Sequence, residues 1–351
     1  MIVFRKIKQF FRFKLFLLSI LISIIIASYF EAKIINIYMP LRNFIYVPDK
    51  LIENEQYQVN LPKGLVYEQS KDGYYVNPWT SSSLLSDEYE KVFNHSCKVM
   101  NNEEKQQIID IADYFIQTVK HRSFQNIDFY VWEYPINWSY SLKPGWISSM
   151  AQGKIAELFA VAYLCTNKMI YNEYMNKTIN SFSVAVENGG ILVEMPIGQW
   201  YEEYAQDDVP SPLVLNGHIY AIQSLKYLIP YNNQAEKLYD EGLKAIIDNI
   251  QKYDAVTWSM YDTVGTPANN VYQQKLHVRQ MKELYEDTGN EIFKYYYQKF
   301  HLQEFSPFSS IQRFIYQPTR FLIFIIVVNT GIIFILLTLA NIIFQKIKRK
   351  S

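Results

Sequence analysis

Phenols, carboxylates and an amide are concentrated in one loop that leads to an apolar helix. The loop reads Gly198-Gln-Trp-Tyr-Glu-Glu-Tyr204, and the stretch Pro210-Ser-Pro-Leu-Val-Leu-Asn-Gly-His-Ile-Tyr220 follows it closely. Flat Trp and Tyr rings can stack on a sugar ring, Glu and Tyr side chains can transfer protons, and an Asn amide can hold a hydroxyl or carboxylate group. This combination is typical of a site that handles sugars.

Other kinds of site have little support in the sequence. The five histidines show no His-Glu-x-x-His or comparable ligand spacing, so a catalytic zinc ion is not predicted. No Gly-x-Ser-x-Gly elbow, P-loop or dinucleotide fingerprint occurs. Asp207-Asp208 could contribute to a cation site, but acidic pairs in loops are far more often solvated. We therefore expect neither a metal nor a cofactor.

The composition predicts a globular protein with a large core and no nucleic-acid partner. The chain has 351 residues, of which 49% are hydrophobic. Its 34 basic and 34 acidic residues balance, and no arginine-rich or zinc-finger pattern occurs. The 29 tyrosines are compatible with carbohydrate stacking, although a coding bias that also enriches Ile, Asn and Lys is the simpler explanation for most of them.

Apolar residues recur with helical spacing through most of the chain after residue 86. Stripes of this kind lie at 108–119, 155–163 and 243–250, and Pro230 ends the helix that contains a fourth stripe at 222–229. Further helices are expected over 86–99, 169–187, 271–288 and 290–301.

These helices predict an all-α fold. Short links make antiparallel helix pairs, and a series of pairs can close into an (α/α) barrel or toroid whose longer loops meet at one end. The polar and aromatic loops at 126–147, 188–212 and 253–270 would share that end. A simple helical bundle is the alternative architecture.

Two hydrophobic segments predict how the chain meets a membrane. Residues 321–344 form an apolar run that spans about 36 Å as a helix, more than the roughly 30 Å hydrocarbon layer of a bilayer. Basic residues follow at 346–350 and place the C-terminus in the cytoplasm by the positive-inside rule. Residues 15–30 are apolar after a basic tail and predict a signal anchor, with a cleavable signal peptide ending near Ala27-Ser28 as the alternative.

The membrane prediction divides the chain and places its central part outside the cytosol, in a lumenal, periplasmic or extracellular space. Cys97 and Cys165 would then lie where a disulfide is permitted but not required. Prolines and short β-prone pieces such as Tyr57-Gln-Val-Asn60 allow a hairpin in the stalk before the helices. The expected parts are a cytoplasmic basic tail at 1–14, a transmembrane signal anchor at 15–30, a membrane-proximal stalk at 31–85, an (α/α) barrel domain at 86–305, a linker at 306–320, a transmembrane helix at 321–344 and a second cytoplasmic basic tail at 345–351.

Five short motifs follow one another in the central part of the chain. They are Gly145-Trp-Ile-Ser-Ser-Met-Ala-Gln-Gly153, Trp200-Tyr-Glu-Glu-Tyr204, Val214-Leu-Asn-Gly217, Leu238-Tyr-Asp-Glu-Gly242 and Tyr261-Asp262. Their order and spacing resemble the C-terminal domain of D-glucuronyl C5-epimerases over about residues 130–302. The resemblance implies an (α/α) barrel and a reaction that inverts the fifth ring carbon of glucuronate, in a polymer of the heparan or heparosan type, to give iduronate.

The resemblance also implies roles for particular residues. Glu203 and Tyr272 are expected on one face of the sugar as a proton relay, and Tyr204 or Tyr261 on the other. Family members place a histidine four residues after the tyrosine matched by Tyr272, whereas His277 lies five residues after it. The expected substrate-binding residues are Gln152 and Asn216, which would position the uronate carboxylate or hydroxyls, together with Trp200, Tyr201 and His277.

Two departures from the family pattern leave other functions open. Animal relatives carry β-rich regions that bind polymer and form a dimer, and an arginine shortly after the tyrosine matched by Tyr261. In this chain only about 55 residues lie between the predicted anchor and the helices, where the β-rich regions would stand. The stretch expected to contain the arginine reads Asp262-Thr-Val-Gly265. The expected partners are a uronic-acid polysaccharide and a lipid bilayer, with a homodimer left open. A polysaccharide lyase acting by β-elimination and a non-catalytic glycan-binding or assembly protein are the alternatives.

Overall fold

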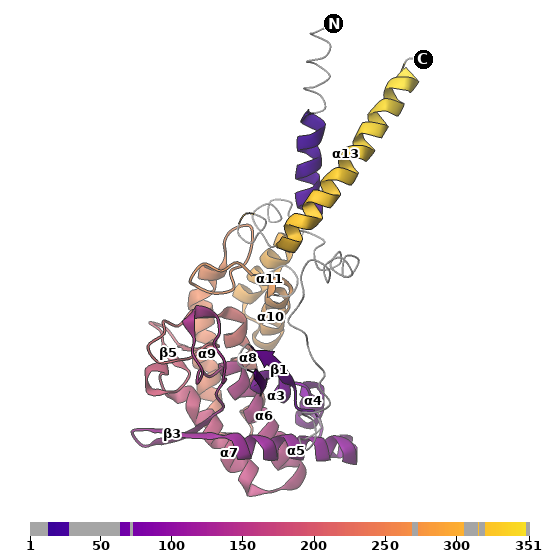
Figure 1. Cartoon of the computed structure of the whole chain (residues 1–351). Coiled ribbons are helices and arrows are strands. Elements are labelled where there is room, and N and C mark those ends of the chain that lie inside the picture. Colours follow the sequence, from indigo (N-terminus) through magenta and orange to yellow (C-terminus); the bar gives the residue numbers. More distant parts are fainter. Residues whose placement is uncertain are drawn as a thin grey trace. The chain divides into compact units, whose positions relative to one another are not determined.

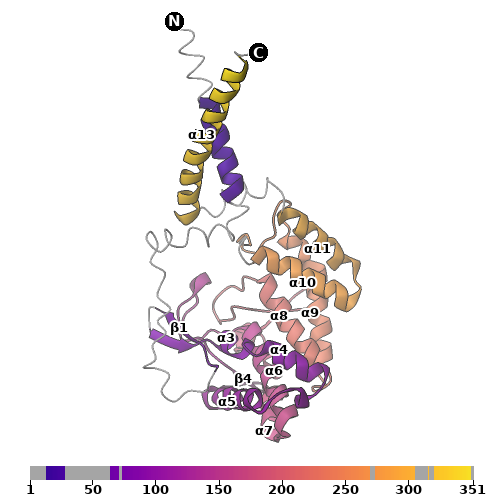
Figure 2. The same ribbon diagram turned by 90° about the vertical axis from the view of Figure 1, so that its right-hand side faces the viewer.

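A computed structural model describes residues 13–27, 64–70, 73–268, 273–304, 315 and 320–348. This part of the chain is mostly helical, as expected, with three short two-stranded antiparallel sheets (Figures 1 and 2). It divides into two compact units. The larger unit contains the described residues within 49–253 and 262–265, and the smaller unit contains those within 1–48, 254–261 and 266–351.

The larger unit alternates hairpins with helices. The stripes predicted at 108–119, 155–163, 222–229 and 243–250 all lie on or at the ends of helices, which confirms those predictions. Its main elements are β1 (Tyr67–Ser70), β2 (Gly73–Val76), α3 (Pro78–Ser83), α4 (Ser86–Asn94), α5 (Asn102–Thr118), β3 (Lys120–Phe124), β4 (Ile127–Val131), α6 (Ser149–Thr166), α7 (Met169–Asn180), β5 (Leu192–Glu194), β6 (Gln199–Tyr201), α8 (Leu215–Leu228) and α9 (Ala235–Asn249).

Helix α6 forms the centre of the larger unit. Most of its residues from Ser149 to Ala162 are buried, so the helix is apolar nearly all round rather than on one stripe. It packs against α3, α4, α5, α7 and α8. A Cβ atom at Gly153 would lie only 2.8 Å from the Cβ of Ser224 on α8, so this glycine permits the two helices to approach closely.

Local sequence signals define where several helices begin. Asn101 starts α5 with a capping box, because its side chain accepts a hydrogen bond from the Glu104 amide and the Glu104 carboxylate accepts one from the Asn101 amide, both at 2.9 Å. Asn77 caps α3 with one side-chain bond, which its Oδ1 accepts from the Thr80 amide at 3.1 Å, and Pro78 occupies the first helical position.

The segment before α4 contains short strands, as predicted for the stalk, but they belong to the larger unit. Strands β1 and β2 pair in a hairpin with Tyr67 opposite Val76 and Ser70 opposite Gly73. Helix α3 follows directly and packs on α6. The predicted domain boundary at residue 86 therefore falls inside the larger unit, because the hairpin and α3 are part of its packing. The hairpin piece suggested at 57–60 lies outside the described residues.

The structure joins Cys97 and Cys165 in a disulfide, which the sequence left open. Cys97 begins a short 3-10 helix (Cys97–Val99), and Cys165 lies in the last turn of α6. The bond closes a loop with a sequence separation of 68 residues. It therefore ties the segment between α4 and α5 to the central helix.

In the smaller unit, α10 (Gln273–Thr288) and α11 (Glu291–Glu304) form a helix pair. Helix α13 (Arg320–Lys348) contains one stretch, Ile323–Ile347, that is long and apolar enough to cross a membrane. Within the described part of the chain no second helix meets that criterion, so the structure supports one of the two predicted spans.

The described part of the other apolar helix, Phe13–Ala27, has 15 residues and is about 22 Å long, shorter than a bilayer core. It lies beside α13, since the Ser23 hydroxyl donates a hydrogen bond to the Ile326 carbonyl at 2.8 Å and the Phe16 and Phe334 rings lie 5.9 Å apart (Figure 1). The predicted tail at 1–14 and the linker at 306–320 fall largely outside the described residues, whereas α13 extends into the predicted tail at 345–351 as far as Lys348.

Candidate functional site

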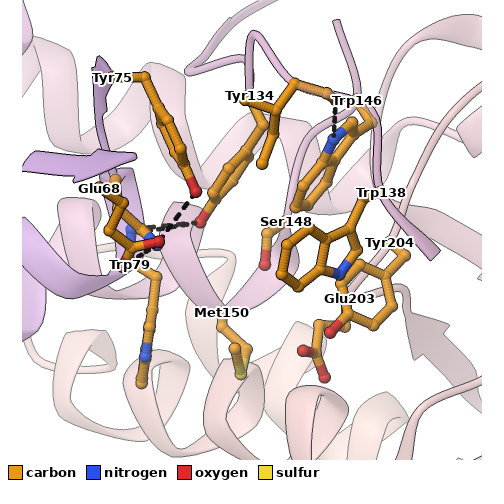
Figure 3. Close-up of a pocket in the computed structure, with 12 residues that line it drawn as sticks. Glu68, Tyr75, Trp79, Tyr134, Trp138, Trp146, Ser148, Met150, Glu203 and Tyr204 are labelled. Atoms are coloured by element: carbon orange, nitrogen blue, oxygen red, sulfur yellow. Dashed lines mark hydrogen bonds between the residues drawn. The ribbon is translucent and has the colours of Figure 1, made fainter. Parts of the chain in front are cut away.

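Three separate chain segments of the larger unit enclose a pocket of about 180 Å³ (Figure 3). The first segment is the β1–β2 hairpin with the start of α3, the second runs from 134 to 150, and the third follows β6. Two carboxylates and six aromatic side chains belong to the lining. The lining residues are Glu68, Tyr75, Asn77, Trp79, Tyr134, Ile136, Trp138, Trp146, Ser148, Met150, Glu203 and Tyr204.

Stacked aromatic rings form one wall of the pocket. Tyr134 and Trp146 are parallel, with ring centres 3.9 Å apart and planes at 7°. Trp138 continues the stack at 6.4 Å from Trp146, and Tyr204 meets the same indole at 5.6 Å. The Trp146 indole N–H donates to the Ile136 carbonyl at 3.0 Å, which fixes the ring orientation. Such a wall presents flat apolar surface to a bound ring.

A hydrogen-bond cluster closes the hairpin side of the pocket. One Glu68 oxygen accepts from the Tyr75 hydroxyl at 2.9 Å, and the other accepts from the Asn77 amide at 2.8 Å and the Thr80 hydroxyl at 3.1 Å. The Tyr134 hydroxyl in turn donates to Asn77 Oδ1 at 3.3 Å. The cluster holds the Glu68 carboxylate and two phenols in fixed positions.

Both phenols of this cluster stay protonated over the physiological pH range. Burial raises the pKa of Tyr75, and the charge of Glu68 raises it further. Burial also raises the pKa of Tyr134, outweighing the Trp79 amide that lowers it, and the charges of Glu203 and Glu68 add to the rise. Each neutral phenol already donates its single hydrogen within the cluster, Tyr75 to Glu68 and Tyr134 to Asn77, so the two phenols add no charge to the pocket.

Glu203 lies on the other side of the pocket, packed against the first turn of α8. It is buried, and a Cβ atom at Gly217 would lie 2.3 Å from Glu203 Oε2. Only glycine leaves room for the carboxylate at this point. The positive end of the α8 dipole favours a negative charge there. Tyr204 is the next residue along the chain and also lines the pocket.

Glu202 stabilises the loop that contains Glu203 and Tyr204. Its carboxylate accepts hydrogen bonds from the Tyr204 amide at 3.1 Å and the Leu213 amide at 2.9 Å, so it closes the loop between β6 and α8. Burial raises the pKa of Glu202 to about 7, although these backbone donors lower it. Glu202 does not line the pocket, and its contacts make it a positioning residue for Tyr204.

A strained turn supports Tyr204 from the opposite direction. Tyr140 and Ser141 both have positive φ, at 61° and 65°, a conformation that costs energy for residues other than glycine. The Tyr140 hydroxyl donates to Asp262 Oδ2 at 2.6 Å, and its ring lies 5.4 Å from that of Tyr204. Asp262 therefore holds the turn that packs on the Tyr204 ring.

Of the predicted site residues, Glu203 and Tyr204 come together in the pocket, whereas three others lie in the core of the larger unit. Gln152 bonds to the Tyr130 carbonyl at 2.7 Å and to the Trp132 amide at 3.2 Å, which ties α6 to β4. Trp200 is fully buried and stacks on His218 at 4.0 Å, and the Tyr201 hydroxyl donates to the Leu238 carbonyl at 2.7 Å. None of the three lines the pocket.

The remaining predicted residues lie elsewhere in the chain. Asn216 is buried in the first turn of α8, next to the glycine that contacts Glu203. Tyr261 and His277 belong to the smaller unit, where the Tyr261 amide donates to the Thr266 carbonyl at 2.7 Å. His277 Nδ1 lies 2.9 Å from the Ser259 hydroxyl, and burial lowers the pKa of His277 to about 3. Tyr272 lies outside the described residues.

Sequence reasoning missed the hairpin side of the pocket. Glu68, Tyr75 and Asn77 fell within the segment predicted to be a stalk, although Gly73 between two short runs containing tyrosine is a hairpin signal. Tyr134 and Trp138 lay in a loop that was expected to be near the site but was not assigned. No group of three or more His, Cys, Asp or Glu residues within the described ranges is arranged to hold a metal ion.

The larger unit is mostly helical and brings stacked aromatic rings and two carboxylates into one pocket. These features are typical of helical proteins that act on sugars. Comparison with known families agrees with this class. Residues 125–302, about half of the chain, match the family described as D-glucuronyl C5-epimerase C-terminus, and the chain belongs to this family.

Two curated relatives illustrate the similarity. An uncharacterized protein of Methanocaldococcus jannaschii is 31% identical over 258 residues, which cover 69% of this chain and 82% of that protein. A protein of Caenorhabditis elegans named D-glucuronyl C5-epimerase is 28% identical over 161 residues, which cover 39% of this chain and 26% of the relative. The match to the named epimerase therefore involves about a quarter of its length.

Proposed function

We propose that this protein is a membrane-anchored uronosyl C5-epimerase that converts D-glucuronate to L-iduronate residues in a polysaccharide. The observation that carries the proposal is the pocket itself, in which Glu203 and Tyr204, the residues that the family resemblance assigned to catalysis, lie beside a wall of stacked aromatic rings. Membership of the epimerase family supports the reaction class. A polymer of the heparosan or heparan sulfate type is the proposed substrate.

The proposed reaction needs a base, an acid and a means of stabilising negative charge. A base takes the hydrogen from the fifth ring carbon, and the electron pair of that bond moves into the carboxyl group to give an enediolate. An acid then returns a proton to the opposite face of the carbon. Hydrogen-bond donors aimed at the carboxyl oxygens stabilise the charge that develops on them.

Glu203 is the proposed base on one face of the sugar. Its burial and its place at the start of α8 hold the carboxylate in one orientation. None of the described lining residues carries a cationic side chain, so neutral donors must bind the substrate carboxylate. The Ser148 hydroxyl is buried in the pocket lining with no hydrogen-bond partner in the described structure, and we assign it to this task.

The other predicted residues keep secondary roles in the proposal. Tyr204 contributes its phenol beside Glu203. Tyr261 and Tyr272 keep the proposed proton-transfer roles, and His277 the proposed substrate-binding role, that the resemblance implies. Asn216 positions the loop or the uronate at the start of α8. Because they are core residues, Gln152, Trp200 and Tyr201 are proposed to support the pocket from behind rather than to contact the sugar.

The wider architecture is also part of the proposal. We propose an (α/α) barrel, which the helix pairs α6–α7 and α8–α9 of the larger unit support. We propose that α13 and the helix Phe13–Ala27 anchor the chain with both termini in the cytoplasm, and that the domain between them lies outside the cytosol. The Cys97–Cys165 disulfide supports an oxidising compartment.

Product analysis tests the proposed reaction. The full chain in detergent is incubated with a heparosan-type polymer, and the products are examined by NMR and ultraviolet absorption. Iduronate signals without new ultraviolet absorption are expected. An unsaturated uronate would instead identify a lyase, and binding of the polymer without any chemical change would identify a non-catalytic protein.

A further inference from the structure

The pocket has two sides that carry separate carboxylates. Figure 3 shows Glu68 with the Tyr75 and Tyr134 hydroxyls on one side, and Glu203 with Tyr204 on the other, with Ser148 and Met150 between them. Inversion of a ring carbon requires that a proton leave from one face and arrive at the other. The side opposite Glu203 must therefore supply a second proton-transfer group, if the proposed function is right.

The hairpin side supplies one phenol that is already connected to a carboxylate. The Tyr75 hydroxyl donates to Glu68 Oε2 at 2.9 Å, and both residues line the pocket. Glu68 Oε1 accepts from Asn77 and Thr80, so the carboxylate cannot turn away from the tyrosine without losing those bonds. Tyr134 is oriented differently, since its hydroxyl donates to an amide oxygen, Asn77 Oδ1, which cannot accept a proton at neutral pH.

We infer that Tyr75, coupled to Glu68, is the proton-transfer group for the face opposite Glu203. When Tyr75 acts as the base, its oxygen takes the proton from the fifth ring carbon while its own proton passes along the hydrogen bond to Glu68. The bond electrons of the broken C–H bond enter the substrate carboxyl group, and Glu203, already protonated, returns its proton to the other face.

When Glu203 acts as the base, the other epimer reacts through the same groups, with the proton initially on Glu68. Glu203 then takes the proton of the ring carbon, Glu68 passes its proton to Tyr75, and Tyr75 passes its own to the opposite face. Tyr75 is neutral before and after each transfer, and one proton is exchanged between two carboxyl groups. Because the described lining contains no cation, this arrangement also limits the negative charge in the occupied pocket.

The experiment measures deuterium entry at the fifth ring carbon from heavy water, separately for glucuronate-containing and iduronate-containing polymers. It uses the full chain and the variants Tyr75→Phe, Glu68→Gln and Glu203→Gln. Each removes a proton-transfer group but keeps the shape of the side chain. Tyr74→Phe is the matched control, because Tyr74 is the neighbouring residue on β2 and does not line the pocket.

The expected result is a complementary pattern. Tyr75→Phe and Glu68→Gln should lose exchange on the order of 100-fold with one epimer and keep it with the other, and Glu203→Gln should do the opposite. Net epimerisation should fall in all three variants, and Tyr74→Phe should match the unaltered protein. Thermal unfolding midpoints of the variants are measured alongside.

Two outcomes would overturn the inference while leaving the proposed function intact. One is an active Tyr75→Phe protein that epimerises within about threefold of the unaltered protein, because general acid–base groups contribute far more than that. The other is equal loss of exchange with both epimers in a folded variant, which would indicate a purely structural role. Absence of exchange in the unaltered protein with either polymer would remove the proposed function, and this inference with it.

Discussion

Single residues at the pocket were predictable where chemistry and family resemblance coincided. Glu203 and Tyr204 stood out because a carboxylate and a phenol lay among aromatic residues ahead of an apolar helix. Trp200 and Tyr201 belong to the same run, but strand β6 directs them into the core. Residue type alone could not separate the two pairs, because the direction of each side chain depends on how β6 and the following loop pack.

The raised pKa of Glu202 is expected to make the free energy of unfolding of the larger unit depend on pH. Burial raises its folded-state pKa from 4.5 to about 7, so the folded protein holds the proton more tightly than the unfolded chain. Its contribution to stability is therefore fully present below pH 4.5 and is lost as the pH rises through 7, with a total change of about 3 kcal/mol.

The variant Glu202→Gln should lack this dependence. Urea unfolding at pH 5 and pH 8 measures the free energy of unfolding of both proteins, and their difference isolates Glu202 from other titrating groups such as His218. Burial lowers the pKa of His218 to about 4, which acts in the opposite direction in both proteins. An equal pH dependence in the two proteins would contradict this role for Glu202.

A side chain at position 217 is expected to displace the Glu203 carboxylate. The variant Gly217→Ala would bring a methyl group to 2.3 Å from Glu203 Oε2, so the carboxylate must move. We expect activity to fall by about 10- to 100-fold, with an overpacking cost of about 1–3 kcal/mol. Lys226→Ala on the same helix is the control. Unchanged turnover in Gly217→Ala would show that the position of Glu203 is not critical.

Elements were predicted best where their pattern was long. The helices at α5, α6, α8 and α9 followed from apolar stripes that extend over two or more turns. Strands β1 and β2 have four residues each, too few for alternation to distinguish them from a loop. The hairpin side of the pocket was missed for this reason. Its contribution also depends on tertiary packing of α3 on α6, which no local pattern encodes.

The disulfide between Cys97 and Cys165 is expected to stabilise the folded protein. Replacing both Cys97 and Cys165 with serine opens a loop with a sequence separation of 68 residues. The free energy of unfolding should fall by about 4 kcal/mol on the chain-entropy relation. Denaturant unfolding of the unaltered protein with and without a reductant gives the same comparison without substitution. Two reactive thiols in the folded, unreduced protein would contradict the bond.

For the whole molecule, the sequence predicted a mostly helical chain with an apolar C-terminal helix, and both are found. The N-terminal anchor was predicted as 16 residues, and its described helix of 15 residues is shorter than a bilayer core. Its contact with α13 through Ser23 could not be read from either segment alone. The disulfide was likewise undecided, because pairing depends on how the segment before α5 meets α6.

The chain matches only about a quarter of the Caenorhabditis elegans epimerase, so its activity must be established on this protein itself. The decisive measurement is the incorporation of deuterium at the fifth ring carbon of a glucuronate-containing polymer incubated with the full chain in heavy water. If Glu203 and its partners move protons at that carbon, deuterium will enter with the unaltered protein. When an iduronate-containing polymer is tested in parallel, Glu203→Gln will lose the entry for one of the two epimers. A folded protein that leaves the carbon unlabelled in every uronan offered would contradict the proposal.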